Sequence, residues 1–189
     1  MAFKFNDDSE KQFKWLLTRY PEKRAALLPC FRLVEEQQGF VNQEAMDYVA
    51  GRLELPPAYV LGVFTFYSHY RREGDGKYIV QVCATLPCGL MGAQMVADTF
   101  KEELKLGIGE TSSDKKFTLK KVECLGSCTT APVCQINDDF FENLTEAKIK
   151  EIVAALKNDK TPPHISNGPS LEGGRCSYRP MIEAYPEGK

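Results

Sequence analysis

Four cysteines stand in two closely spaced pairs, and each pair follows a short run of residues typical of a β-strand. The first cysteine loop, residues 83–88, begins and ends with a cysteine and follows the run 78–82. The second cysteine loop, residues 124–128, is built in the same way and follows the run 117–122. Two strand ends, each followed by a two-thiol loop, can bring four sulfurs to one point, as an iron–sulfur cluster or a zinc ion requires. The candidate ligands are Cys83, Cys88, Cys124 and Cys128.

The spacing within the two loops favours a cluster over structural zinc, which stays open as an alternative. A [2Fe–2S] cluster contains two irons, each of which takes two thiolates, so two separated pairs supply one pair per iron. Zinc-binding cysteine pairs usually have a two-residue spacer, although two to four residues are allowed. Gly89 and Gly126 carry no Cβ and would let backbone N–H groups approach the cluster sulfurs. Apolar neighbours would keep water away: Leu86, Pro87, Leu90 and Leu125.

Other uses of the cysteines fit the sequence less well. A dithiol redox enzyme would have a Cys-x-x-Cys motif, which neither loop contains, and four unliganded core cysteines would not explain the adjoining strands and glycines. Cys30 and Cys134 have apolar neighbours and are most simply small buried residues. Cys134 is also close enough to Cys128 in the sequence to be a substitute ligand. Cys176 lies in the C-terminal tail and receives no assignment.

No second chemistry is indicated elsewhere in the sequence. His69 and His164 are isolated, so the two-histidine pattern of a Rieske site is missing. The chain has no phosphate-binding glycine loop, no GxGxxG motif after a strand and no nucleophile elbow. We therefore predict no catalytic residue and no nucleotide or flavin site in this chain.

Composition restricts the class of protein further. The 189 residues are 43% hydrophobic and 26% charged, which is ordinary for a globular protein. The net charge of −2 gives no electrostatic signature of nucleic-acid binding. No apolar run reaches membrane-spanning length, and the first residues resemble neither a signal nor a transit peptide. Seven cysteines without an export signal favour reduced thiols and metal ligation. We expect a cytoplasmic, bacterial protein.

Residues 1–72 predict an N-terminal bundle of four helices. Their ends are indicated by Ser9, Pro21, Gly39, Asn42 and Pro57. Pro29 should kink the second helix or remove one of its hydrogen bonds. The expected inward positions of the fourth helix are Val60, Val63, Phe64 and Tyr67. A helix-turn-helix redox sensor is a minor alternative, because ten basic and nine acidic residues give this segment no basic face.

Residues 73–157 predict a smaller α+β domain, after a polar break at 71–76. The expected order is β-α-β-β-β-α. The six segments are 77–83, a helix from about 91 to 104, 117–123, 133–136, a short strand from 140, and a last helix that begins at Asn143 or Thr145. Residues 158–189 are rich in proline and glycine, and we expect no packed element there.

With these motifs in place, the sequence resembles the thioredoxin-like [2Fe–2S] subunit of respiratory complex I, the NuoE-type subunit of NADH:quinone oxidoreductase. The resemblance rests on the Cys-x4-Cys pair and on the segment Cys-Leu-Gly-Ser-Cys-x-x-Ala-Pro that ends at Pro132. The segments 24–29, 39–40 and 62–67 also match the family in the same order. The match covers roughly residues 10–157.

The resemblance implies a thioredoxin-like [2Fe–2S] ferredoxin domain after the helical bundle. It implies that Cys83, Cys88, Cys124 and Cys128 hold one [2Fe–2S] cluster. It also implies a flavoprotein partner of the NuoF type, which binds NADH and FMN, other peripheral-arm subunits, and attachment to the cytoplasmic face of the inner membrane through the complex. Related subunits of NAD-linked hydrogenases and formate dehydrogenases remain alternatives.

Two parts of the chain are expected to contact a partner. The N-terminal bundle has more aromatic residues than four short helices need, notably Trp15, Phe64, Phe66 and Tyr67. The C-terminal tail has too few periodic apolar residues to fold alone, so we expect it to become ordered on the partner.

Overall fold

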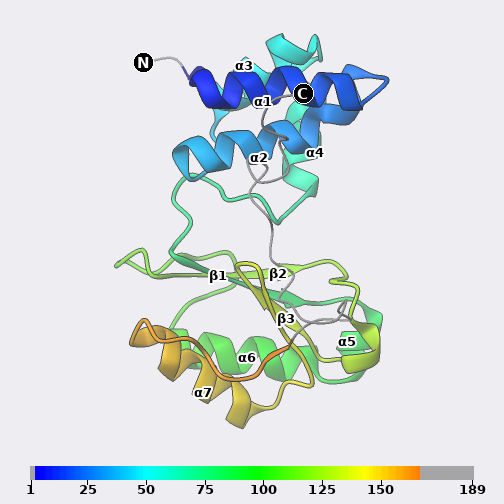
Figure 1. Cartoon of the computed structure of the whole chain (residues 1–189). Coiled ribbons are helices and arrows are strands. Elements are labelled where there is room, and N and C mark those ends of the chain that lie inside the picture. Colours follow the sequence, from blue (N-terminus) through cyan, green and yellow to red (C-terminus); the bar gives the residue numbers. More distant parts are fainter. Residues whose placement is uncertain (1–2, 167–189) are drawn as a thin grey trace. The chain divides into compact units, whose positions relative to one another are not determined.

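The structure is a computed structural model in which residues 3–166 are described (Figure 1). The chain divides between Glu73 and Gly74 into two compact units. The domain boundaries suggested by the sequence, with segments 1–72, 73–157 and 158–189, remain our proposal.

The first unit consists of helices around one apolar core. Its elements are α1 (Asp7–Arg19), the 3-10 turn η1 (Lys23–Ala26), α2 (Leu27–Gln38), α3 (Gln43–Leu53) and α4 (Pro57–Phe66). Each helix turns an apolar face toward the others, and the fully buried side chains of the core include Phe13, Leu27, Phe31, Val49 and Val60. The predicted helical bundle is therefore present.

Of the predicted N-terminal caps of α1 and α3, the structure confirms the one of α3. Asn42 caps α3 as predicted, since its side-chain oxygen accepts a hydrogen bond from the Ala45 N–H at 3.1 Å. The predicted cap of α1 was wrong. Asn6 is the cap, and its side-chain oxygen accepts from the Ser9 N–H at 2.8 Å. The helix thus begins earlier because Asn6 is as good a cap as serine and places two aspartates in the first turn.

The second helix starts later than predicted, and this removes the expected effect of Pro29. Pro21 opens no α-helix, and the chain passes through η1 before α2 begins at Leu27. Pro29 is then the third residue of α2, where a backbone N–H has no partner inside the helix anyway. No internal hydrogen bond of α2 is lost. Gly39 ends α2 with φ of +86°, as predicted for a C-cap.

The fourth helix differs from the prediction on one face. Val60 and Phe64 are buried, but Tyr67 ends the helix and is 43% exposed instead of pointing inward. Phe64 packs against Phe31, with ring centroids 5.6 Å apart, so it belongs to the core and is not spare surface for a partner. Trp15 is also packed against the core. Of the four proposed contact residues, Phe66 and Tyr67 remain exposed.

The second unit is a mixed sheet with two long helices packed together on one side (Figure 1). The strands are β1 (Tyr78–Cys83), β2 (Phe117–Val122), β3 (Cys134–Ile136), β4 (Asp139–Phe141) and β5 (Ile165–Ser166), in the order β2-β1-β3-β4-β5. β1 and β2 are parallel and the other neighbours are antiparallel. The helices are α5 (Leu86–Leu90), α6 (Ala93–Leu104) and α7 (Glu146–Lys157), with the 3-10 turn η2 (Cys128–Thr130).

The apolar sides of the sheet and the helices form the core of this unit. Val80, Val82 and Leu119 of the sheet share one buried cluster with Phe100 of α6 and with the inward face of α7. That inward face is Ile149, Ile152, Val153 and Leu156, as predicted, and Thr145 is the cap of α7. The predicted β-α-β-β-β-α order is thus found. The additions are α5, which the sequence did not suggest, and β5, which lies where an irregular tail was expected. Cys176 and the rest of the tail from residue 167 lie outside the described residues.

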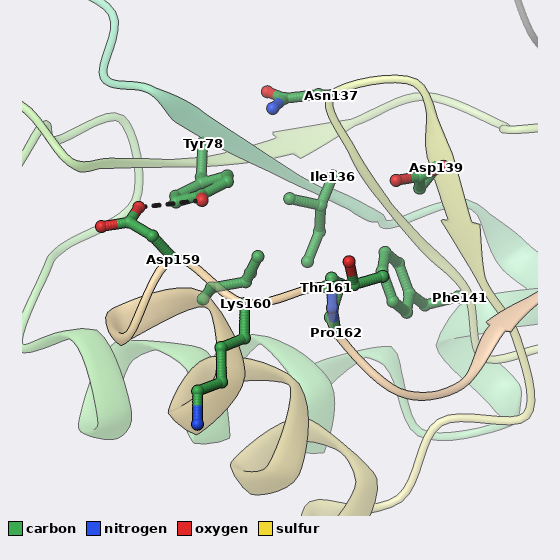
Figure 2. A pocket seen from close by; sticks show the side chains of 10 residues that line it. Tyr78, Ile136, Asn137, Asp139, Phe141, Asp159, Lys160, Thr161 and Pro162 are labelled. Carbon is green, nitrogen blue, oxygen red and sulfur yellow. Dashed lines mark hydrogen bonds between the residues drawn. The ribbon is translucent and has the colours of Figure 1, made fainter.

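A cavity of 250 Å³ lies at one end of β1, as Figure 2 shows. Its wall includes Tyr78, the first residue of β1, and Asp159, which follows α7. The Asp159 carboxylate accepts hydrogen bonds from the Tyr78 hydroxyl at 3.0 Å and from the Lys77 ammonium at 2.6 Å. Hydrogen bonds from Lys77 above all, then from Lys116 and Tyr78, hold the pKa of Asp159 well below its usual range. The first cysteine loop begins at the opposite end of β1, so this cavity is separate from the cysteines.

Among residues 3–166, no helix combines the length and the apolar character that crossing a bilayer requires.

Candidate metal centre

The two parallel strands place the two cysteine loops at the same edge of the sheet. Cys83 is the last residue of β1, and its register partner is Val122, the last residue of β2. Because the two strands end side by side, the two cysteine loops begin side by side. The Cys83 N–H also donates to the Val133 carbonyl at 3.2 Å, which ties the first loop to the segment that follows the second.

The second cysteine loop has the geometry of a metal-binding pair. The Cys124 and Cys128 sulfurs are 3.6 Å apart. Two thiolates on one tetrahedral metal at about 2.3 Å would be about 3.8 Å apart. The Gly126 N–H points at the Cys124 sulfur over 3.4 Å. Gly126 has φ of +81°, so this turn requires a residue without a Cβ.

The first cysteine loop turns directly into α5. Pro87 stands in the first turn of α5, where its missing N–H costs nothing, and Cys88 is the third residue of the helix. The Gly89 N–H donates to the Thr85 carbonyl at 2.8 Å, which closes the turn. Gly89 has no unusual φ, and a Cβ there would meet no atom of the chain. The backbone conformation therefore explains the glycine at position 126 but not the one at position 89.

The two pairs differ in burial. Cys83 and Cys88 are each 2% exposed and pack with Ala93, Ala131 and Val133 in a small apolar cluster. Cys124 and Cys128 are exposed. The first pair is thus packed inside the domain, while the second pair lies on its surface.

The thiol pKa values indicate that the four sulfurs act on one another. Burial raises the pKa of Cys83, but hydrogen bonds from Thr85 and the Leu125 backbone outweigh it, and the net shift is downward. Burial and the neighbouring Cys83 raise the pKa of Cys88 to about 11. The Gly126 N–H and the Cys128 thiol lower the pKa of Cys124, and Cys124 raises that of Cys128. Each loop therefore pairs a thiol whose pKa is lowered with a thiol whose pKa is raised, and metal binding would displace the protons of both.

The close sulfur–sulfur contact of the site lies within the second cysteine loop, between Cys124 and Cys128. Among the residues that the structure describes, no three His, Cys, Asp or Glu side chains are grouped so that they could hold one metal ion. Two thiolates per metal is what a [2Fe–2S] cluster requires, since its two irons share the four cysteines. The donor set, the 3.6 Å sulfur pair and the amide on Cys124 fit such a cluster.

The remaining cysteines and histidines of residues 3–166 lie elsewhere. Cys30 and Cys134 are fully buried, as predicted, and burial raises the pKa of both thiols, that of Cys30 to about 12. A protonated thiol in the core is a poor substitute ligand. His164 pairs with Glu151 at 2.7 Å on the surface, and His69 belongs to the helical unit.

Two residues around the loops were missed by the sequence analysis. The Thr85 hydroxyl lies 3.3 Å from the Cys83 sulfur, and it also lowers the pKa of Cys124 across the two loops. Its position two residues after a candidate ligand was a usable signal. Glu142 accepts hydrogen bonds from residues of the second loop region. No local pattern points to that contact, because the partners are more than ten positions away.

The chain is similar to known proteins in sequence and in fold. The model of the thioredoxin-like [2Fe-2S] ferredoxin family matches residues 13–157. NADH-quinone oxidoreductase subunit 2 of Thermus thermophilus is 40% identical over 159 residues, which cover 82% of this chain and 88% of that one. A subunit of the NADH-quinone oxidoreductase of Rickettsia typhi is 39% identical over 161 residues, or 84% and 95% of the two chains. An NAD+-reducing [NiFe]-hydrogenase in the H2-reduced state has a similar fold, with a TM-score of 0.60 and 15% identity over 72% of this chain and 23% of that one.

Proposed function

The chain belongs to the thioredoxin-like [2Fe-2S] ferredoxin family, and from this we propose that it is the electron-transfer subunit of an NADH-quinone oxidoreductase. The [2Fe–2S] cluster of that family supplies a one-electron redox centre when bound. In our proposal the four cysteines of the two loops hold the cluster, and no residue of the chain performs a catalytic step.

The convergence of the two cysteine loops at one edge of the sheet carries this proposal. The parallel register of Cys83 with Val122 brings the loops together, and the 3.6 Å sulfur pair of the second loop matches two thiolates on one metal. The test is metal analysis and EPR of the full chain purified without oxygen. We expect two irons per chain and, after reduction, the signal of one [2Fe–2S] cluster. About one zinc and no iron per chain would show that the site is structural zinc.

The family relatives are subunits by name, so the chain works beside other chains. We propose that its immediate partner is the NuoF-type subunit that binds NADH and FMN. We further propose that the chain lies on the cytoplasmic face of the inner membrane and is attached through the complex. The hydrogenase likeness concerns the fold alone, at 15% identity. The identity of the subunits that purify with this chain would distinguish an NADH-quinone oxidoreductase from an NAD-linked hydrogenase.

Exposed apolar side chains beside the first cysteine loop support a docking face for that partner. Leu86, Leu90 and Met91 are 74%, 77% and 61% exposed, and they flank Cys88 at both ends of α5. Large apolar side chains this exposed are unfavourable in water and gain free energy when a partner covers them. Electron exchange with a flavin also requires this edge of the domain to approach the flavin-bearing subunit.

We expect Leu90→Ser to weaken binding of the flavoprotein subunit about ten- to a hundredfold, because burying a leucine side chain contributes about 1.5–3 kcal/mol. The cluster content should not change, since Leu90 contacts solvent. Titration of the two purified subunits by calorimetry measures the effect. Ile108→Ser is the matched control, because Ile108 is also exposed, at 38%, but lies after α6. Equal affinities of wild type and Leu90→Ser would remove α5 from the interface.

A further inference from the structure

We propose that Glu142 is a positioning residue that holds the second cysteine loop in the conformation that takes the cluster. The inference rests on the proposed function, because it treats Cys124 and Cys128 as ligands. Glu142 follows β4 directly, and its hydrogen-bond partners are hydroxyl groups and not the cysteines. It acts through the residues on either side of Cys128.

The Glu142 carboxylate binds two hydroxyl groups of the second loop region. One of its oxygens accepts a hydrogen bond from the Thr130 hydroxyl at 2.6 Å and another from the Ser127 hydroxyl. The two hydroxyl oxygens are also 2.8 Å from each other, so both lie against the same carboxylate oxygen. Ser127 is only 6% exposed, so its hydroxyl depends on this carboxylate in place of water.

Backbone hydrogen bonds strengthen the same connection. The Asn143 N–H donates to the Thr130 carbonyl at 2.7 Å, and the Leu144 N–H donates to the Pro132 carbonyl at 3.1 Å. Residues 142–144 therefore run along residues 127–132 and fix them to the end of the sheet. Cys128 lies between Ser127 and Thr130 and moves with them.

The exposed cysteines need such a support. Cys83 and Cys88 are held by packing in an apolar cluster, whereas Cys124 and Cys128 are exposed and have no comparable packing. Hydrogen bonds must then set the direction of their sulfurs. Residues that orient metal ligands from behind typically change metal affinity by about 10–100-fold when they are replaced. The carboxylate of Glu142 is placed to do this for the second loop.

Four variants of the full chain, purified without oxygen, test the proposal. Glu142→Ala removes the acceptor, and Ser127→Ala with Thr130→Ala removes both donors. Glu142→Gln keeps an oxygen that can accept the same hydrogen bonds. Glu102→Ala is the control, because it removes a carboxylate of α6. The readouts are iron per chain, the rate of iron loss to a chelator, and the EPR g-values of the reduced state.

We expect Glu142→Ala and the double variant to lose iron about tenfold faster than wild type and to show shifted g-values. Glu142→Gln should restore most of the retention, and Glu102→Ala should match wild type. A merely structural role would lower the melting temperature without moving the g-values. Wild-type iron loss and g-values in Glu142→Ala would overturn the proposal. If Glu142→Ala does not fold, iron loss from Glu142→Gln as fast as from the double variant would overturn it. Absence of iron from wild type would instead refute the proposed function.

Discussion

Replacing any one of the four loop cysteines with alanine is expected to abolish stable binding of iron. Each iron of a [2Fe–2S] cluster depends on two protein thiolates, so one missing sulfur leaves one iron half-ligated. Iron content should fall from two per chain to a small fraction of that, and the visible absorption of the cluster should disappear or fade within the preparation. Iron analysis and absorption spectra of the anaerobically purified variants measure this. The variants are Cys83→Ala, Cys88→Ala, Cys124→Ala and Cys128→Ala.

The control variants use cysteines outside the two loops. Cys30 is fully buried in the helical unit and belongs to its core, so Cys30→Ala should keep its iron. Cys176→Ala should keep its iron as well. Full iron content in Cys124→Ala or Cys128→Ala would contradict the proposed ligand set and would require another ligand. A cluster lost equally from Cys30→Ala would point to general instability instead.

The burial difference between the pairs suggests how the four losses will differ. Cys83 and Cys88 are part of an apolar cluster, so alanine there also removes a buried sulfur from the domain core. Replacing Cys124 or Cys128, which are exposed, removes a ligand and almost no packing. Equal iron loss with unequal loss of thermal stability is therefore the expected pattern.

The sequence was sufficient for the parts of the fold that depend on local patterns. The strands before each cysteine pair alternate or concentrate apolar residues, and the long helices α6 and α7 repeat them at helical spacing, so both could be predicted. The strand ends then implied the meeting of the loops, which the register of Cys83 with Val122 now shows. The assignment of the four sulfurs as ligands remains a prediction.

Short elements and solvent-facing sides could not be predicted. α5 has five residues, two of which are proline and glycine, so no periodic signal could mark it. β5 has two residues after a double proline and exists because β4 offers it an edge. α4 is apolar on nearly every side, so its pattern could not tell buried Phe64 from exposed Tyr67. The contacts of Glu142 join residues that no local pattern relates.

Oxidation of NADH by this chain alone is expected to stay at the background rate. Hydride transfer from NADH moves two electrons together, whereas the cluster of this family is a one-electron centre. A flavin can accept the pair and release single electrons, but the chain has no phosphate-cradling loop for either nucleotide. In our proposal the redox centre is the cluster held at the edge of the sheet, where the two cysteine loops meet. We therefore expect electrons from NADH to reach that edge through a flavin-bearing partner.

The measurement compares the chain alone, the flavoprotein subunit alone and the two together. With NADH and ferricyanide, the isolated chain should give the rate of the buffer blank. In the mixture, NADH should bring about the EPR signal of the reduced cluster, to the extent that its potential allows. Leu90→Ser should slow this reduction at subunit concentrations near the dissociation constant, since the exposed leucines of α5 lie on the edge that must approach the flavin. NADH oxidation by the isolated chain that is free of partner and disappears on mutation of this chain would reveal an active site of its own. A reducible cluster in Cys83→Ala with the wild-type rate would show that Cys83 is not one of its ligands.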